Sequence, residues 1–215
     1  LIFYFGKRSY IAFDEGFYAL QARWILDKGN WIVPLWWNDY VLDRTIGLQF
    51  LIAKSQDIFG RNIFSAYLPT TAAAILMLFI TFKLHEEFFS NKYAIISPLI
   101  LCTTYIWFDY SHLATQDIIY SCLVTLGVFS LIKIKSKDNK FYLLLFGIWI
   151  GLSFMMKTFL VLVPLLSLLP YLYIKKNLFF SKFFWLGLLI GFIPYFFWAL
   201  SINPYLEKNI IFYLV

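Results

Sequence analysis

The sequence predicts an all-α membrane protein, built as a polytopic bundle of transmembrane helices. Of its 215 residues, 61% are hydrophobic and only 14% are charged, so too little polar surface is present to cover a soluble core. The hydrophobic residues also form long runs that are separated by charged loops. These runs lack the alternation of barrel strands, and lipid offers no partner for an unpaired backbone group, which leaves helices as the spanning structure.

Six runs approach the length of about 20 apolar residues that a hydrocarbon core requires. They cover approximately 64–84, 93–108, 117–132, 141–156, 158–174 and 178–200. The apolar stub in 1–12 is too short for a span and is expected to be the tail of a first helix, and 210–215 begins another apolar run. We therefore expect one transmembrane domain over 1–215, as a piece of a longer protein.

The distribution of charge predicts the orientation of the bundle. If the six runs alternate sides, three short loops on one side carry nine lysines and three acids, whereas the remaining nine basic and nine acidic residues fall on the other side. By the positive-inside rule, the lysine-rich loops 83–92, 133–140 and 175–182 are cytoplasmic. The segment 14–62 then forms an external loop.

Two interfacial helices are expected within this external loop. Phe17, Leu20, Trp24 and Ile25 recur at helical spacing before a stop at Gly29, and a second amphipathic stretch covers roughly 44–59. Between them lie aromatic rings of the kind that concentrate at the membrane surface, namely Trp31, Trp36, Trp37 and Tyr40.

Several simple functions are excluded by composition and spacing. The net charge of +6 comes from lysines in separate short loops, which argues against a nucleic-acid surface. Cys102 and Cys122 lie inside apolar runs and are interpreted as small packing residues. His112 has no second His or Cys nearby, so a zinc site is not indicated.

An ordered set of motifs resembles a known family. Residues 13–18 read Phe-Asp-Glu-Gly-Phe-Tyr, 29–34 read Gly-Asn-Trp-Ile-Val-Pro, 115–117 read Thr-Gln-Asp, and 151–157 run from Gly-Leu to Lys. This order is similar to that of C-type (GT-C) glycosyltransferases that use polyprenyl-phosphate sugars, the protein O-mannosyltransferases and lipid A aminoarabinose transferases. The resemblance implies a GT-C-like fold, a bacterial plasma membrane location with the site facing outside, and no required cofactor.

Sugar transfer with inversion needs a carboxylate to orient or deprotonate the acceptor and cations to hold the departing phosphate. The resemblance assigns Asp14, Glu15 and Asp117 to the catalytic role. Each acid has an alternative explanation, because an acid is also favoured at the start of a helix. A cluster of acids can also bind a divalent cation through its carboxylate oxygens, although no such cation is indicated.

Three residues are candidates for the donor phosphate. Lys157 separates two apolar runs, where an isolated cation must pair or snorkel. Arg44 offers a planar guanidinium, although Asp43 beside it is an alternative partner, and the resemblance adds Tyr18.

The chain departs from its relatives at three places: Asp43-Arg44-Thr45 replaces a Lys-Pro element, Phe17 replaces an Arg, and Thr158-Phe159 replaces a Gly-Pro or Gly-Phe pair. These departures leave the sugar and the acceptor, whether protein, lipid A or another glycan, open. The predicted function is transfer of a sugar from a polyprenyl-phosphate donor to an external acceptor. The alternative is a secondary transporter or flippase, which would carry charges near the middle of its spans.

Overall fold

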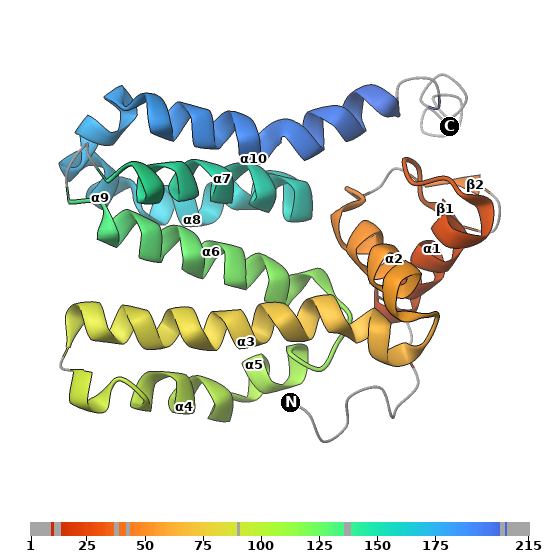
Figure 1. Ribbon diagram of the computed structural model, residues 1–215, viewed down its shortest axis with the longest axis horizontal. Coiled ribbons are helices and arrows are strands. Elements are labelled where there is room, and N and C mark those ends of the chain that lie inside the picture. The colour runs from red at the N-terminus through yellow and green to blue at the C-terminus, as the bar shows by residue number, and fades with distance from the viewer. Residues whose placement is uncertain are drawn as a thin grey trace.

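A computed structural model describes residues 10, 14–36, 39–41, 44–89, 91–135, 139–202 and 205 of the chain. Apart from Tyr10, the predicted tail of a first helix in 1–12 lies outside these residues. The C-terminal apolar run 210–215 also lies outside them. Figure 1 shows a bundle of long helices with a smaller cap of short elements at one end.

The long helices of the bundle are α3 (Ile63–Phe88), α6 (Gln116–Lys133), α7 (Lys140–Lys157) and α10 (Lys182–Ser201). They pack in the order α3, α6, α7, α10, and Figure 1 shows them side by side. Among the described residues, four stretches are long and apolar enough to cross a membrane, and each contains one of these helices. The protein is thus a multi-pass membrane protein with an all-α bundle, as the sequence predicts.

The other two predicted spans are interrupted. The first is divided into α4 (Ile96–Thr103) and α5 (Tyr105–Tyr110). The second is divided into the 3-10 turn η2 (Thr158–Val161), α8 (Leu162–Ser167) and α9 (Leu169–Ile174), and it ends in a further 3-10 turn, η3 (Lys176–Phe180). The 3-10 turn η1 (Asn91–Tyr93) precedes α4. Both interrupted segments lie along the bundle in Figure 1, and the number of membrane spans stays a prediction.

Local chemistry explains the interruptions. The hydroxyls of Thr103 and Thr104 both donate to the carbonyl of Ile100, at 2.8 and 3.1 Å, and so compete with the backbone bonds that would continue the helix. In the second segment, Pro164 and Pro170 each remove a backbone N–H donor, and Leu168 between them separates the end of α8 from the start of α9. A hydropathy pattern does not record either effect.

Glycines bring α7 and α10 into backbone contact. Gly147 and Gly151 on α7 face Gly187 and Gly191 on α10, with both pairs at a spacing of four residues. A Cβ atom added to any of these glycines would lie 2.1 to 2.5 Å from backbone atoms of the other helix. Small residues at this spacing let membrane helices approach closely. We call these four residues the glycine seam.

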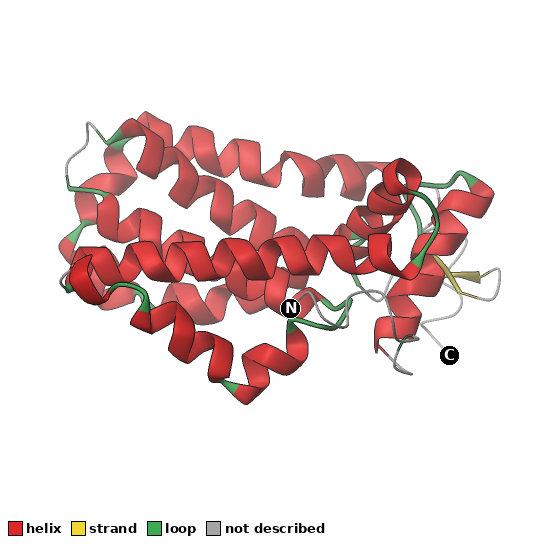
Figure 2. Ribbon diagram, turned by 60° about the horizontal axis from the view of Figure 1, so that its bottom comes forward, coloured by secondary structure: helices red, strands yellow, loops and turns green. Residues whose placement is uncertain are grey.

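The cap consists of α1 (Asp14–Lys28), a hairpin of β1 (Leu35–Trp36) and β2 (Asp39–Tyr40), and α2 (Gly47–Phe59). The two strands are antiparallel, with Leu35 opposite Tyr40, and Figure 2 shows them as a small element beside helices. α1 packs on α2, and the indole of Trp198 on α10 donates to the carbonyl of Ile32 at 2.7 Å. The two helices predicted within 14–62 are therefore present, and their interfacial, external position stays a prediction.

The buried face of α1 differs from the predicted one. Tyr18, Ala22 and Ile25 are buried, whereas Phe17 and Trp24 are only half-buried. The same holds for Leu20, which was also expected on the apolar face. The difference arises because α1 packs against α2, so tertiary contact and not the hydrophobic pattern alone selects its inner face.

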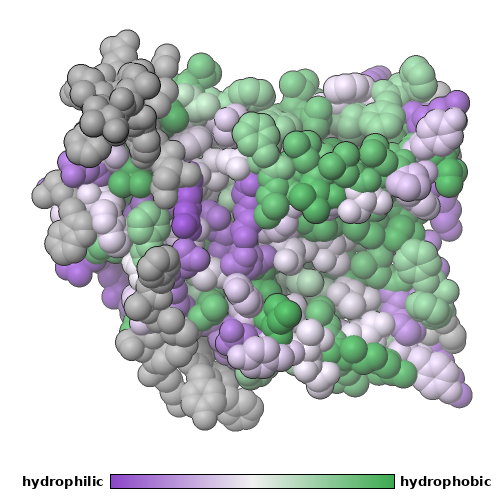
Figure 3. Space-filling view, turned by 180° about the vertical axis from the view of Figure 1, so that it is seen from behind, coloured by the Kyte–Doolittle hydropathy of each residue, from purple (hydrophilic) through white to green (hydrophobic). Residues whose placement is uncertain are grey.

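The lysine-rich loops meet at the end of the bundle opposite the cap. The ammonium group of Lys133 pairs with Glu87, and that of Lys175 donates to the carbonyls of Leu131, Ile132 and Ile134 at the end of α6. Figure 3 shows hydrophilic side chains at this end and in a band between bundle and cap, with hydrophobic ones along the bundle. The polar ends and apolar length are those of a membrane-spanning body.

Candidate active site

The first group of the site joins α1 to the segment before α2. Arg44 Nη1 donates to Asp14 Oδ1 at 3.1 Å and to the hydroxyl oxygen of Tyr18 at 2.6 Å. Burial raises the pKa of Tyr18, which Arg44 opposes only in part, so the phenol keeps its proton near neutral pH. Burial alone would lower the pKa of Arg44, but its bonds to Tyr18 and Asp14 outweigh burial and raise it.

The second group joins two helices of the bundle. Lys157 Nζ donates to Asp117 Oδ1 at 2.6 Å. Asp117 lies in the first turn of α6 and Lys157 in the last turn of α7, where the helix dipoles favour a negative and a positive charge respectively. Lys157 is 24% exposed and Asp117 38%, so both ions stay within reach of a ligand.

The residue after Lys157 has an unusual backbone conformation. Thr158 has φ 44° and ψ −125°, a region that glycine adopts readily and that a β-branched residue rarely adopts. Thr158 is the position where the sequence departs from the glycine common among the family that it resembles. This turn reverses the chain directly after Lys157 and so leaves the lysine at the tip of α7.

One cavity of about 290 Å³ brings the two groups together. It is lined by Asp14, Tyr18, Arg44, Thr45, Gln116, Asp117, Met156, Lys157, Thr158 and Leu160. Five of the six predicted site residues are in this set, although they come from four separate parts of the chain. We call it the charged cavity. It contains two carboxylates and two cations at the cap end of the bundle.

Glu15 is the predicted site residue that does not line the charged cavity. Its side chain is 2% exposed, and Oε1 accepts the backbone N–H of Ala114 at 2.8 Å. The adjacent acids Asp14 and Glu15 thus have different surroundings, one at the cavity and one in the packed interior.

Sequence reasoning missed several residues of the cavity wall. Gln116 and Thr45 are next to the predicted residues Asp117 and Arg44, and that adjacency was the available signal. The Thr45 hydroxyl donates to the carbonyl of Met156 at 3.4 Å, which links the cap to the end of α7. No sequence pattern identifies Met156 or Leu160.

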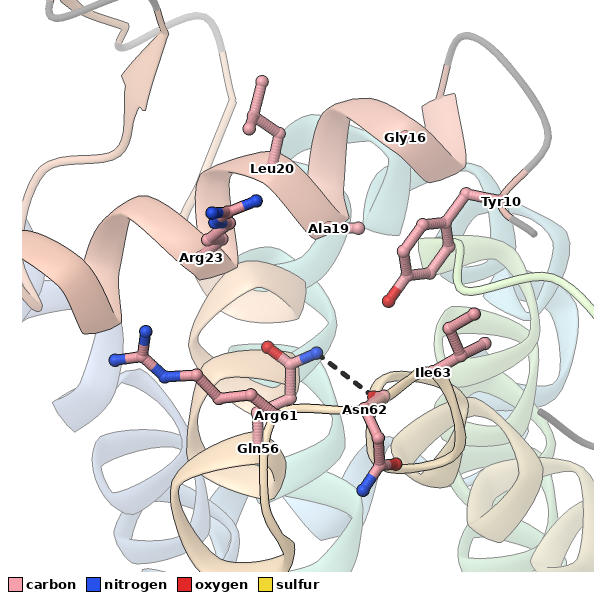
Figure 4. A pocket seen from close by; sticks show the side chains of 9 residues that line it. All are labelled: Tyr10, Gly16, Ala19, Leu20, Arg23, Gln56, Arg61, Asn62 and Ile63. Carbon is pink, nitrogen blue, oxygen red and sulfur yellow. Dashed lines mark hydrogen bonds between the residues drawn. The ribbon is translucent and has the colours of Figure 1, made fainter.

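A second, larger cavity lies on the other face of α1. It measures about 640 Å³ and is lined by Gly16, Ala19, Leu20 and Arg23 of α1, and Figure 4 shows this helix across the space from Asn62 and Ile63 at the start of α3. Arg23 pairs with Asp27 on the same helix at 3.4 Å. α1 therefore separates this space from the charged cavity.

His112, the other polar residue considered in the sequence, makes a local contact. His112 Nδ1 lies 2.6 Å from the carbonyl oxygen of Phe108, one helical turn earlier. Within the described part of the chain, no three side chains of His, Cys, Asp or Glu lie together in a way that could hold a metal ion. The expectation of a reaction without metal or cofactor stays a prediction.

Comparison with known proteins places the chain in a family. The model of the dolichyl-phosphate-mannose-protein mannosyltransferase family matches residues 43–199, which include Arg44, Asp117 and Lys157. The chain belongs to this mannosyltransferase family. The match covers most of the chain, and it confirms the family resemblance found in the sequence.

Curated relatives of this mannosyltransferase-family chain include two bacterial proteins described as undecaprenyl phosphate-alpha-4-amino-4-deoxy-L-arabinose arabinosyl transferase. The one from Enterobacter sp. (strain 638) is 29% identical over 176 residues, which are 76% of this chain and 31% of that protein. The one from Edwardsiella ictaluri is 25% identical over 222 residues, covering 91% of this chain and 40% of that protein. The chain thus spans about a third to two fifths of their length.

A solved structure shows the same fold. The crystal structure of ArnT from Cupriavidus metallidurans bound to undecaprenyl phosphate matches with a TM-score of 0.83 at 16% sequence identity. The match covers 97% of this chain and 40% of that one. The prediction of a GT-C-like polytopic bundle is confirmed.

Proposed function

We propose that the protein transfers a sugar from a polyprenyl-phosphate donor to an acceptor at the outer face of the membrane. The observation that carries the proposal is the charged cavity, where Asp14 and Asp117 lie with Arg44 and Lys157 at one end of a membrane-spanning bundle. Support comes from the relatives, which are named as transferases that use an undecaprenyl-phosphate sugar.

The cations Lys157 and Arg44 would hold the donor phosphate. Each already pairs with a carboxylate, Asp117 or Asp14, so a phosphate would compete for cations that are held in place. The guanidinium of Arg44 matches two phosphate oxygens, whereas the ammonium of Lys157 acts as a compact charge. Tyr18 supports this end of the site, because its hydroxyl oxygen accepts from Arg44 and its own proton can be donated to a phosphate oxygen.

Asp14 would orient the acceptor and take its proton. Its side chain is 56% exposed and lines the cavity, so an acceptor hydroxyl can reach it. In a single displacement, the acceptor oxygen bonds to the anomeric carbon as the bond from that carbon to the phosphate oxygen breaks. The bonding pair leaves with the phosphate, and the acceptor proton passes to Asp14. The product is inverted at that carbon.

The proposed location is the bacterial inner membrane, with the cavity on its outer side. The lysines gather at the opposite end of the bundle, which the positive-inside rule places in the cytoplasm. A transporter would need charges along its spans, whereas the described charges of this site lie together at the cap end. The charge distribution therefore favours the transferase.

Transfer by the full-length protein tests the proposal. The purified protein is given polyprenyl-phosphate sugars carrying labelled aminoarabinose, mannose or glucose, with lipid A and protein acceptors. For the accepted pair, Asp14→Asn is expected to lower kcat about 10²- to 10⁴-fold, because the base is lost. Binding of undecaprenyl phosphate itself, followed by native mass spectrometry, should not weaken, because the change frees Arg44 from its pair with Asp14.

The matched control is Asp57→Asn. Asp57 is an exposed acid on α2 that pairs with Lys54 at 2.9 Å, away from the charged cavity, so its variant should keep the activity of the unmodified protein. Wild-type turnover by Asp14→Asn would remove Asp14 from the reaction. Absence of transfer from every polyprenyl-phosphate sugar by the unmodified protein would refute the proposed function.

A further inference from the structure

Glu15 is a buried acid that binds across the fold. Its carboxylate is 2% exposed and accepts the N–H of Ala114, a residue that is itself fully buried and 99 positions away in sequence. Burying a carboxylate costs several kcal/mol unless hydrogen bonds compensate, so a buried acid in this position requires an explanation. The Ala114 bond ties α1 to the turn between α5 and α6.

This bond lies between the two carboxylates of the charged cavity. On one side, Glu15 is bonded directly to Asp14 in the first turn of α1. On the other side, Ala114 precedes Thr115, the N-cap residue of α6, and Asp117 follows two residues later in the first turn of that helix. A shift of Ala114 away from Glu15 would therefore change the separation of Asp14 from Asp117.

The position of Glu15 separates it from the reacting groups. A general base must lie within hydrogen-bond reach of the proton that it removes. Glu15 does not line the charged cavity, and its Oε1 is directed to a backbone N–H on another segment. A charged acceptor makes this bond stronger than a neutral one would.

We propose that Glu15 is a positioning residue, which fixes Asp14 of α1 against the Asp117–Lys157 pair by holding the N–H of Ala114. The effect on catalysis rests on the proposed function, whereas the structural tie does not. Misplacement of a catalytic group by about 1 Å can lower the rate about 10²-fold, so loss of this bond should change kcat strongly. The donor phosphate site, built from Lys157 and Arg44, should change less, because Thr45 beside Arg44 donates to the carbonyl of Met156 beside Lys157.

Two variants of the full-length protein separate positioning from catalysis. Glu15→Gln keeps an oxygen that can accept from Ala114, whereas Glu15→Ala removes it. We expect Glu15→Ala to lower kcat about 10²-fold with KM for the donor and affinity for undecaprenyl phosphate unchanged within threefold. Glu15→Gln should recover at least a tenth of the wild-type kcat, because the tie is retained without the charge.

A distance measurement tests the tie without relying on catalysis. Spin labels are placed at the exposed positions Arg23 of α1 and Tyr110 at the end of α5, by Arg23→Cys and Tyr110→Cys. The native Cys102 and Cys122 are first replaced by Ser. Glu15→Ala should broaden the measured distance distribution, and Glu15→Gln should restore it.

The outcomes are distinct. A distribution that is unchanged in a folded Glu15→Ala protein overturns the proposal, whatever the activity. If Glu15→Gln is as inactive as Asp14→Asn while its spin-label distance is native, the positioning proposal is overturned and Glu15 is a catalytic acid. If the unmodified protein transfers no sugar, the proposed function fails, and the distance measurement still decides the positioning role.

Discussion

The glycine seam and the charged cavity hold their parts together in opposite ways. At the seam, α7 and α10 touch through backbone atoms, and four glycines leave no room for a side chain. At the cavity, the contacts are made by charged side chains: Arg44 joins the segment before α2 to Asp14 of α1, and Lys157 of α7 pairs with Asp117 of α6. Shape fixes the first contact and charge fixes the second.

The difference indicates what each region can do. A backbone contact has one geometry and gives the bundle a fixed frame. An ion pair at the surface contributes about 0 to 1 kcal/mol and can exchange its partner for a ligand. The exchangeable ion pairs therefore line the cavity where we propose that a phosphate binds. The rigid backbone contacts lie elsewhere, between α7 and α10.

The largest effect is expected at the seam. Gly187→Val would place a Cβ 2.1 Å from the carbonyl oxygen of Leu144, so α7 and α10 must separate. We expect a loss of about 3 kcal/mol of folding stability, measured by thermal unfolding in detergent. The control is Leu189→Val on the exposed face of α10, which should unfold near the wild-type temperature. Equal unfolding temperatures for the two variants would contradict the close approach.

A smaller effect, on the binding of undecaprenyl phosphate, is expected at the charged cavity. Lys157→Met should weaken binding of undecaprenyl phosphate about tenfold, whereas Asp117→Asn should strengthen it, because the variant frees Lys157 from its 2.6 Å partner. A double-mutant cycle on stability should give a coupling energy of about 1 kcal/mol, since the pair is partly exposed. Native mass spectrometry measures the binding and thermal unfolding the stability. Weaker binding by Asp117→Asn would show that this acid positions Lys157 for the ligand and does not compete with the ligand for it.

The smallest effect is expected beside the cavity. Thr158→Gly should raise stability by about 1 kcal/mol, because relief of the strain at φ 44° exceeds the entropy that glycine loses on folding. Thr104→Gly is the matched control, because Thr104 has φ −71° and the same change there should destabilise. The two unfolding temperatures should move in opposite directions. A fall in both unfolding temperatures would show that the backbone of Thr158 is not strained.

Much of this arrangement could be predicted from the sequence, wherever it depends on patterns of neighbouring residues. Charges bounding apolar runs predict the long helices. Rare acids and cations at the ends of runs, together with the ordered family motifs, predict Asp14, Asp117, Lys157 and Arg44, which the charged cavity brings together. The burial of Glu15 could not be predicted, because its partner is 99 residues away. The inner face of α1 and the backbone strain at Thr158 depend on tertiary packing in the same way.

The glycine seam also orders the assembly of the protein during its synthesis. α7 ends at Lys157, and α10, whose glycines match it, begins at Lys182, so the interrupted segment is synthesised between them. The glycine face of α7 has no matching backbone until α10 has also inserted. The contact between α7 and α10 can thus form only after α10 has been synthesised. Truncation before α10 would leave α7 inserted but without its fixed partner.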